Sequence, residues 1–311
     1  MTEAAGLEPS GAAVRPAASL TFAGFVLDRP RIMGVVNVTP DSFSDGGDAY
    51  PPPAAIDRGL ALHAAGAAIV DVGGESTRPG AELVPVEEEL ARVVPVVEEL
   101  ARSGVVVSVD TRRAAVMEAA MEAGATIVND VSALTGDPGS MHLVARRQAS
   151  VVLMHMQGDP RTMQLAPRYD DVVRDVYEWL RERIAACEAT GIALGRLAID
   201  PGIGFGKTIE HNLALLAHLD VFATLGRPLI LGVSRKSFIA RLSRDEAPKD
   251  RVAGSLAAGL FGLLHGVHIL RVHDVAETRQ ALAVWQAIAD KRSKSDALMH
   301  VIRCAGDPMC R

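Results

Sequence analysis

Short apolar runs recur along the chain, and each is too short to form a good helix. The first of them is rich in β-branched residues and stops abruptly at polar turn formers, as a buried strand does. The runs cover residues 31–38, 68–73, 105–109, 126–128, 151–155, 197–199, 229–233 and 267–272. The pattern therefore predicts eight short strands.

Helical patterns separate these runs. Residues 170–191 place apolar side chains three and four positions apart and stop at Gly191, in a C-cap position. Asp274 and Glu277 resemble a capping box that opens a later helix. Strand and helix thus alternate through eight cycles, which indicates an α/β protein with a single-domain (β/α)₈ TIM barrel. A doubly wound open sheet is the alternative.

The two ends of the chain differ from its middle. Residues 1–20 are rich in Ala, Pro and Gly without periodicity, and we expect a flexible arm there. After Phe22 a short apolar stretch predicts a plug or a minor hairpin. Residues 21–290 then form the barrel, and residues 291–311 are expected to be a C-terminal tail.

Composition narrows the class of protein. Hydrophobic residues make up 49% of the chain and charged residues 23%, as in ordinary globular proteins. The net charge of -6 argues against a nucleic-acid surface, which needs a clustered basic face. The first residues do not resemble a secretory signal, and the three cysteines lack metal-site spacing, which suggests reduced thiols. We therefore expect a cytoplasmic protein.

Polar side chains follow nearly every apolar run. In a TIM barrel the chemistry gathers where strands run into the following loops, so this recurrence indicates a site. Each residue alone has a structural explanation: Asp110 is placed to cap a helix, and Asn129 with Asp130 to form a turn. The residues at these positions are Asn37, Asp71, Glu75, Thr77, Arg78, Asp110, Asn129, Asp130, His155, Asp200, Ser234, Lys236, Arg271 and His273.

The residue types suggest a flat heterocyclic ligand. Two acids and an amide, Asp110, Asn129 and Asp200, suit a ring that carries both donors and acceptors on its edge. Met154 and Phe205 are candidates for the apolar faces that enclose such a ring, although core filling is the more common role of an isolated Met or Phe.

Cationic residues suggest an oxyanion in the same site. Arg78, Arg271 and His273 suit a phosphate group, and solvated salt bridges are the alternative for the arginines. Asn37 is a candidate oxygen ligand for Mg²⁺, which takes few protein ligands together with phosphate oxygens. The segment PGIGFGKT is not a Walker loop, because Pro201 replaces its first glycine.

Several separate blocks make the sequence resemble the dihydropteroate synthase family. They are GVVNVTPDSFSDGG, VDVGGESTRPGA, SVDT, VND, LMHMQG, IDPGIGFGKT, GVSRKSFI and ILRVHDV, within residues 31–289. The resemblance implies a (β/α)₈ barrel, a Mg²⁺ cofactor and a role as a sulfonamide target. It also implies condensation of 6-hydroxymethyl-7,8-dihydropterin pyrophosphate with p-aminobenzoate, which gives 7,8-dihydropteroate and pyrophosphate in folate biosynthesis.

The resemblance further implies a role for each matching residue. The pterin pocket would comprise Asp110, Asn129, Met154, Asp200, Phe205, Gly232 and Lys236. The pyrophosphate would contact Arg78, Arg271 and His273, with Asn37 as the Mg²⁺ ligand. The contacts of p-aminobenzoate would be Phe43, Thr77, Pro79, Lys236 and Ser237. The residues that take part in catalysis would be Asp110, Lys236, Arg271, His273 and Asn37.

Two other functions compete with the synthase. A pterin-binding methyltransferase shares the barrel and the Asp/Asn/Asp pocket but would not need NVTPDSF or STRPGA. A catalytically silent pterin-binding paralogue should have lost Asn37, Arg78 or Lys236, and all three are present. The segment 251–266 is unusually rich in small residues, which favours close packing or dimerisation, and we expect a homodimer.

Overall fold

Eight parallel strands form the centre of the protein. The structure, a computed structural model, describes residues 20–38, 51–76, 83–159 and 162–306, with side chains up to residue 291. The strands lie in the order β8-β7-β6-β5-β4-β3-β10-β9. They are β3 (Arg31–Asn37), β4 (Ile69–Gly73), β5 (Val107–Asp110), β6 (Ile127–Asp130), β7 (Ser150–Met154), β8 (Leu197–Asp200), β9 (Ile230–Leu231) and β10 (Ile269–Val272).

The sheet closes on itself. A parallel bridge between Ile199 and Leu229 joins β8 to the residue that precedes β9. The N–H of Ile199 also donates to the carbonyl of Pro228 at 2.9 Å. The TIM barrel predicted from the alternation of strand and helix is therefore confirmed, and the open sheet is excluded.

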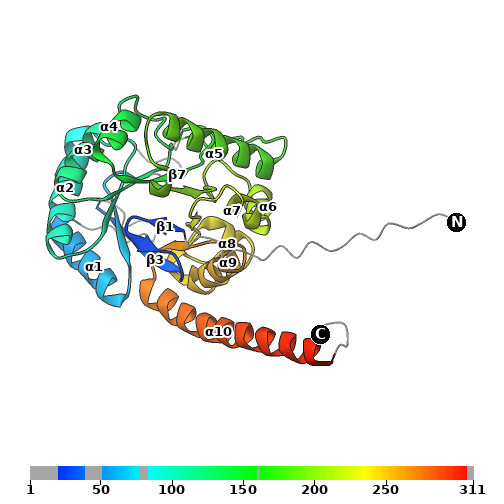
Figure 1. The fold of residues 1–311 in the computed structure, drawn as a ribbon. Coiled ribbons are helices and arrows are strands. Elements are labelled where there is room, and N and C mark those ends of the chain that lie inside the picture. The colour runs from blue at the N-terminus through cyan, green and yellow to red at the C-terminus, as the bar shows by residue number, and fades with distance from the viewer. Residues whose placement is uncertain (1–19, 39–50, 77–82, 160–161, 307–311) are drawn as a thin grey trace.

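Helices surround the strands, and their apolar faces pack on the outside of the barrel (Figure 1). The helices are α1 (Pro52–Ala65), α2 (Val86–Arg102), α3 (Ala114–Glu122), α4 (Ser140–Arg147), α5 (Val172–Ala189), α6 (Ile209–Ala217), α7 (Leu219–Ala223), α8 (Ser237–Arg241), α9 (Val252–Leu264) and α10 (Val275–Gly306), with 3₁₀ turns η1 (Leu194–Arg196) and η2 (Pro248–Arg251). Asp171 caps α5, because its carboxylate accepts from the N–H groups of Val173 and Arg174.

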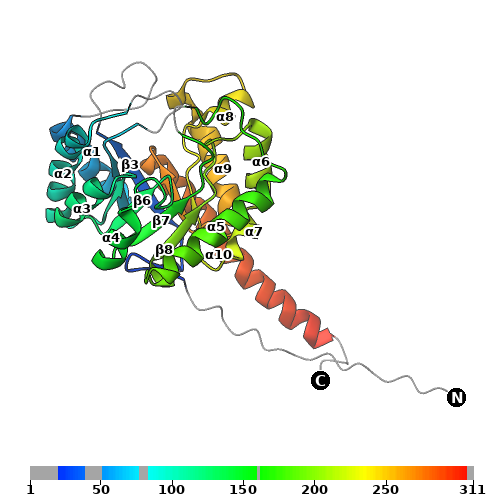
Figure 2. The same ribbon diagram turned by 90° about the horizontal axis from the view of Figure 1, so that it is seen from above.

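The segment expected to be a C-terminal tail, residues 291–311, begins within the last helix. The last helix, α10, does not stop near residue 290 but continues to Gly306. Figure 2 shows its final turns extending past the barrel.

A hairpin closes the N-terminal end of the barrel. It consists of β1 (Thr21–Phe22) and β2 (Phe25–Val26), which pair antiparallel, and it crosses the barrel end that faces the viewer in Figure 1. Phe22 is fully buried there in a cluster with the innermost apolar side chains of the strands. These side chains are Met33, Ile69, Ile127, Val152, Ala198, Ile230 and Ile269. The plug predicted after Phe22 is confirmed.

The layer above this cluster is polar. Because side chains alternate along a strand, the residue two positions further on points to the same side. Thus Ile69 of β4 is followed on the inside of the barrel by Asp71, and Ile269 of β10 by Arg271. The corresponding residues of β6, β7, β8 and β9 are Asn129, Met154, Asp200 and the residue after Leu231, which is Gly232. The strand alternation therefore brings polar groups together at the C-terminal end of the barrel.

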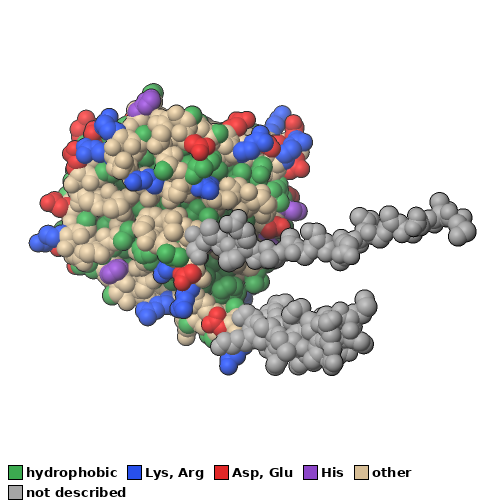
Figure 3. Space-filling model, viewed as in Figure 1, with side chains coloured by type: hydrophobic (Ala, Val, Ile, Leu, Met, Phe, Trp, Pro, Cys, Tyr) green, Lys and Arg blue, Asp and Glu red, His purple; other side chains and the backbone are tan. Residues whose placement is uncertain are grey.

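The described surface carries no large charge of one sign on the face seen in Figure 3, where acidic and basic side chains are interspersed around the rim. Among the described helices, none has an apolar stretch long enough to cross a membrane. Cys187 is a free thiol buried in α5.

Candidate active site

Arg271 connects two carboxylates in the polar layer. Its Nε donates to Oδ2 of Asp71 at 2.7 Å, and its Nη2 donates to Oδ2 of Asp110 at 2.6 Å. Asp71 also accepts from Nδ2 of Asn129 at 3.0 Å. Asp71 is fully buried, and a buried carboxylate is costly unless it is paired. The network therefore holds the guanidinium in one place across β4, β5 and β10.

The network places Asp110 close to a change of charge at neutral pH. Burial raises the pKa of Asp110 to about 7, and the nearby carboxylate of Asp71 adds to this, while Arg271 acts in the opposite direction. Burial also disfavours the charged form of Arg271, but Asp71 and Asp110 outweigh it and raise its pKa above the ordinary value. Arg271 is therefore a permanent cation, whereas Asp110 can gain or lose a proton.

The helix-cap explanation for Asp110 is wrong. The helix that follows, α3, begins at Ala114, and the N–H of Ala114 donates to Oδ2 of Asp137 at 2.9 Å. The carboxylate of Asp110 is bound by Arg271 instead. By contrast, the turn explanation holds for Asp130, whose carboxylate accepts from the N–H groups of Ser132 and Leu134 at 2.7 and 2.9 Å.

Asp200 and Lys236 form the opposite side of the barrel mouth. Oδ1 of Asp200 accepts from the N–H of Gly202 at 2.7 Å. A Cβ placed on Gly232 would lie 3.7 Å from Oδ2 of Asp200 and 3.9 Å from Nζ of Lys236. Both side chains therefore flank this glycine. Burial raises the pKa of Asp200, and burial lowers that of Lys236 to about 8.

Lys236 also contacts the loop between β8 and α6. Its ammonium donates to the carbonyl of Ile203 and lies 4.7 Å from the centre of the Phe205 ring. An ammonium over an aromatic face is an attractive contact. The predicted pterin residues on this side, Asp200, Phe205 and Lys236, are thus neighbours in space.

The other predicted residues that the structure describes lie at the same end of the barrel. Met154 ends β7 and is buried, and half-buried Asn37 ends β3. His273 follows β10, and both its N–H and its Nδ1 face Oγ of Ser234, at 3.2 and 3.0 Å. Ser237 is the first residue of α8 and is exposed. Four predicted residues, Phe43, Thr77, Arg78 and Pro79, lie outside the described residues.

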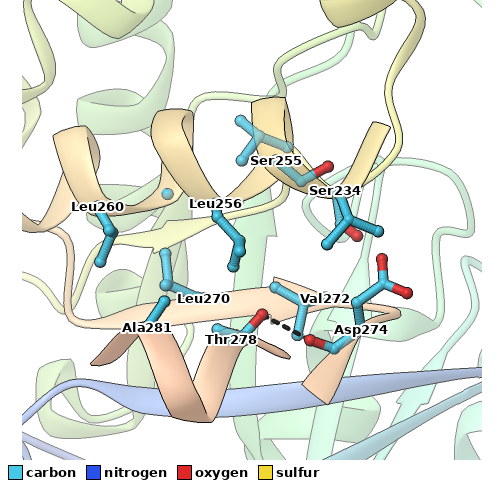
Figure 4. A pocket seen from close by; sticks show the side chains of 12 residues that line it. Ser234, Ser255, Leu256, Leu260, Leu270, Val272, Asp274, Thr278 and Ala281 are labelled. Atoms are coloured by element: carbon cyan, nitrogen blue, oxygen red, sulfur yellow. Dashed lines mark hydrogen bonds between the residues drawn. The ribbon is translucent and has the colours of Figure 1, made fainter. Parts of the chain in front are cut away.

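A small cavity lies behind Ser234, between α9, β10 and α10 (Figure 4). Ser234 and Asp274 line one end of it, and Leu256, Leu260 and other apolar side chains line the rest. Its volume of about 10 Å³ is too small for a substrate. The cavity is therefore a packing gap and not a substrate pocket.

Asp71 is the residue to which sequence reasoning gave no role. It was recognised as a polar residue near a strand end, yet it accepts from both Arg271 and Asn129 and so connects two predicted site residues. The available signal was its place in VDVGG, two positions after Ile69, which makes it an inward-facing charge. Its partners lie 58 and 200 residues away along the chain, so the sequence could not identify them.

The chain is similar to known proteins over most of its length. Residues 33–273 match the family model described as pterin binding enzyme. The dihydropteroate synthase of Escherichia coli K12 is 49% identical over 262 residues, which cover 84% of this chain and 92% of that protein.

Two solved structures extend the likeness to the fold. The Xanthomonas albilineans dihydropteroate synthase with 4-aminobenzoic acid has a TM-score of 0.80 and 54% identity, covering 85% of this chain and 95% of that one. The same enzyme in complex with 7,8-dihydropteroate has a TM-score of 0.76 and 50% identity, with the same coverage of 85% and 95%. The chain therefore belongs to the dihydropteroate synthase family of pterin binding enzymes.

Proposed function

We propose that the protein condenses 6-hydroxymethyl-7,8-dihydropterin pyrophosphate with p-aminobenzoate to give 7,8-dihydropteroate and pyrophosphate. The observation that carries this proposal is the polar layer at the barrel mouth, in which Arg271 lies between Asp71 and Asp110 and Asp200 lies beside Lys236. Two related solved structures are complexes with 4-aminobenzoic acid and with 7,8-dihydropteroate.

The pterin ring would bind between the two sides of this layer. Its guanidine-like edge donates protons, which suits the carboxylate of Asp200. Asn129 already donates its amide N–H to Asp71, so its carbonyl oxygen is left to accept from the ring. Met154 and Phe205 supply apolar contact with the ring faces. Gly232 has no side chain, so only its backbone lies beside Asp200.

Asp110 would stabilise the charge that develops on the pterin. When the bond between the methylene carbon and the pyrophosphate oxygen breaks, its electron pair leaves with pyrophosphate and the pterin becomes cationic. An ionised Asp110 stabilises this cation, while Arg271, His273 and Arg78 stabilise the departing anion. The amine nitrogen of p-aminobenzoate then bonds to the methylene carbon and loses one proton to solvent. Lys236 acts as a hydrogen-bond donor, since no carbonyl substrate is present for a Schiff base.

Mg²⁺ is the proposed cofactor, with Asn37 as its protein ligand. Among the described residues, no group of three or more His, Cys, Asp or Glu side chains is arranged to hold a metal ion. Asn37 supplies a neutral oxygen from the end of β3, and phosphate oxygens of the substrate would complete the shell, as Mg²⁺ prefers. When bound, Mg²⁺ neutralises charge on the pyrophosphate.

The p-aminobenzoate would bind on the outer side of the pterin. Lys236 and the exposed hydroxyl of Ser237 can donate to its carboxylate. Phe43, Thr77 and Pro79, which lie outside the described residues, are proposed to complete this subsite.

The proposal is tested by measuring pyrophosphate release from the dihydropterin substrate with Mg²⁺, with and without p-aminobenzoate, while the pterin product is identified by mass spectrometry. We expect pyrophosphate release that depends on the amine and one dihydropteroate per pyrophosphate. Pterin binding without turnover would identify a silent paralogue, and methyl transfer from a methylated folate would identify the methyltransferase. Either result would overturn the synthase.

We also propose a homodimer formed through the groove between α6, α8 and α9. The groove has a volume of about 780 Å³, and its lining includes the exposed apolar side chains Leu213, Leu242 and Phe261. Its rim carries both signs of charge, with Glu246 and Asp250 beside Arg244 and Arg251. A surface of this kind can complement a second copy of itself.

The dimer is tested by analytical ultracentrifugation. Wild-type protein should sediment as a dimer, and Phe261→Asp should sediment as a monomer because it places a charge in the apolar groove. Leu165→Asp, at an exposed side chain away from the groove, is the matched control and should stay dimeric. A monomeric wild type would contradict the proposal.

We further propose that the protein acts in the cytoplasm. The support is chemical: Cys187 is a free thiol in the described part of the chain, as expected in a reducing compartment. Cell fractionation with the untagged protein tests this location.

A further inference from the structure

The loop between β8 and α6 contains a buried lysine to which the proposed mechanism gives no role. Lys207 is 3% exposed. Its Nζ donates to the carbonyl of Phe205 at 2.9 Å and to the carbonyl of His155 at 3.4 Å, and it lies 3.0 Å from Nδ1 of His155. One amine therefore binds both the loop that carries Phe205 and the residue that directly follows Met154.

The backbones of these two segments also touch at two glycines, Gly202 and Gly206. A Cβ on Gly202 would lie 1.9 Å from the carbonyl oxygen of His155, and a Cβ on Gly206 would lie 2.5 Å from that of Gln157. Both glycines have positive φ, so only glycine allows this approach. The hydroxyl of Tyr169 donates to the carbonyl of Gly206 at 2.8 Å and supports the loop from its other side.

The contacts of Lys207 hold in either charge state of its amine. An ammonium donates to both carbonyls and to Nδ1 of His155, with the Tyr169 ring 6.0 Å away. Burial lowers the pKa of Lys207, and a neutral amine would donate to the two carbonyls and accept from an Nδ1–H of His155. The clamp therefore depends on the amine and on the length of the Lys207 side chain. It does not depend on the charge of the amine.

We infer that Lys207 is a positioning residue that clamps the β8–α6 loop to the end of β7 and so sets the positions of Phe205 and Met154 around the pterin ring. This inference rests on the proposed function, because it assigns the clamp to the pterin subsite. Phe205 contacts Lys236 through its ring, so a displaced Phe205 would also disturb that ammonium. The described hydrogen bonds of Lys207 go to Phe205 and His155, and none of them goes to Ser237 of α8.

The test is calorimetric binding of 6-hydroxymethyl-7,8-dihydropterin to the full chain, together with the KM for each substrate. Lys207→Met keeps the length of the side chain and removes its hydrogen bonds, so we expect pterin affinity to fall by about tenfold or more. The KM for p-aminobenzoate should rise by less than pterin affinity falls, because Lys236 contacts the clamped loop whereas Ser237 belongs to α8. Lys291→Met, at an exposed lysine on α10, is the control and should bind pterin normally.

A double-mutant cycle separates a positioning role from general destabilisation. If Lys207 acts in part through Phe205, then Lys207→Met should weaken pterin binding clearly less in the Phe205→Ala background than in the wild type, and the remaining effect comes from Met154. Fully additive effects, or unchanged pterin affinity in Lys207→Met, would overturn the inference. So would equal changes in pterin affinity and in the KM for p-aminobenzoate.

A milder variant keeps the inference testable if Lys207→Met does not fold. Tyr169→Phe removes only the hydroxyl that supports Gly206, and we expect about twofold to threefold weaker pterin binding. If Tyr169→Phe bound pterin as tightly as the wild type, the position of the β8–α6 loop would not control pterin affinity. If the wild type binds pterin but makes no dihydropteroate, the proposed function fails while the clamp can still be measured.

Discussion

The two ends of the barrel are built from the same strands and differ in what the strands place inside. At the N-terminal end, Phe22 and the innermost strand residues form a fully apolar cluster. Two residues further along, β4 and β10 place Asp71 and Arg271 inside the barrel. The same strand therefore contributes an apolar side chain at one end of the barrel and a charged one at the other.

The two ends also differ in the free energy of burying their side chains. Burying the apolar cluster stabilises the fold by about 25 cal/mol for each Å² removed from water. Burying Asp71, Asp110 and Asp200 costs free energy, which pairing with Arg271 and Lys236 only offsets. A buried layer of paired charges is expected where the residues serve a function.

Removing the cation of the polar layer should have the largest effect. Arg271→Met leaves Asp71 and Asp110 without their partner, so we expect kcat/KM to fall by about 10³-fold or more. The free energy of unfolding should also fall, by about 3–5 kcal/mol. Steady-state kinetics and urea unfolding measure both. Activity within tenfold of wild type would contradict a catalytic role for the layer.

Truncating Phe22 should lower the stability of the protein without lowering kcat, which distinguishes the two ends of the barrel. Phe22→Ala removes a fully buried ring from the apolar cluster and should lower the free energy of unfolding by about 3–5 kcal/mol. Below the melting temperature kcat should stay within about twofold of wild type, because the ring lies at the opposite end from the site. A large loss of kcat in folded Phe22→Ala would show that the two ends are not independent.

The pH profile should report the polar layer alone. Below its pKa of about 7 Asp110 is protonated and neutral, so it cannot stabilise a cationic pterin. As pH falls below 7, kcat/KM should therefore drop about tenfold per pH unit. Above the pKa of Lys236, about 8, loss of its proton should lower kcat/KM again. Phe22→Ala should keep this bell shape; a flat profile in wild type would exclude both groups.

The smallest effect is expected from Ser108→Ala. It would mean that a polar side chain inside the barrel is not enough to make a residue part of the site. Ser108 pairs with Asp71 in the register of β4 and β5, and its Oγ is buried with no hydrogen-bond partner in the described part of the chain. Ser108→Ala should change the free energy of unfolding by less than about 1 kcal/mol and leave kcat/KM within about twofold. A strong loss of activity would mean that the hydroxyl takes part in the site.

The sequence predicted the fold well because the fold depends on local patterns. Apolar runs that end in polar residues identified all eight strands of the barrel, and the period of residues 170–191 identified α5. The continuation of α10 to Gly306 was missed, since that segment carries no motif.

The candidate site was predicted in part. Asp110, Asn129 and Arg271 were recognised from their positions after strands, and the structure joins them through hydrogen bonds. The central place of Asp71 and the clamp of Lys207 were not predicted, because each depends on partners brought close only by the closed barrel. Spacing along the chain shows which residues face inward, and it does not show which of them touch.

The central claim, that the carboxylate of Asp110 serves the reaction and not the fold, is tested most directly by Asp110→Asn. Amine-dependent pyrophosphate release and the free energy of unfolding should be measured on the same preparation at pH 8. We predict that kcat falls by about 10²–10³-fold, since the amide cannot stabilise a cation, while the free energy of unfolding stays within about 1 kcal/mol of wild type. Near-normal kcat in the folded variant would contradict the account.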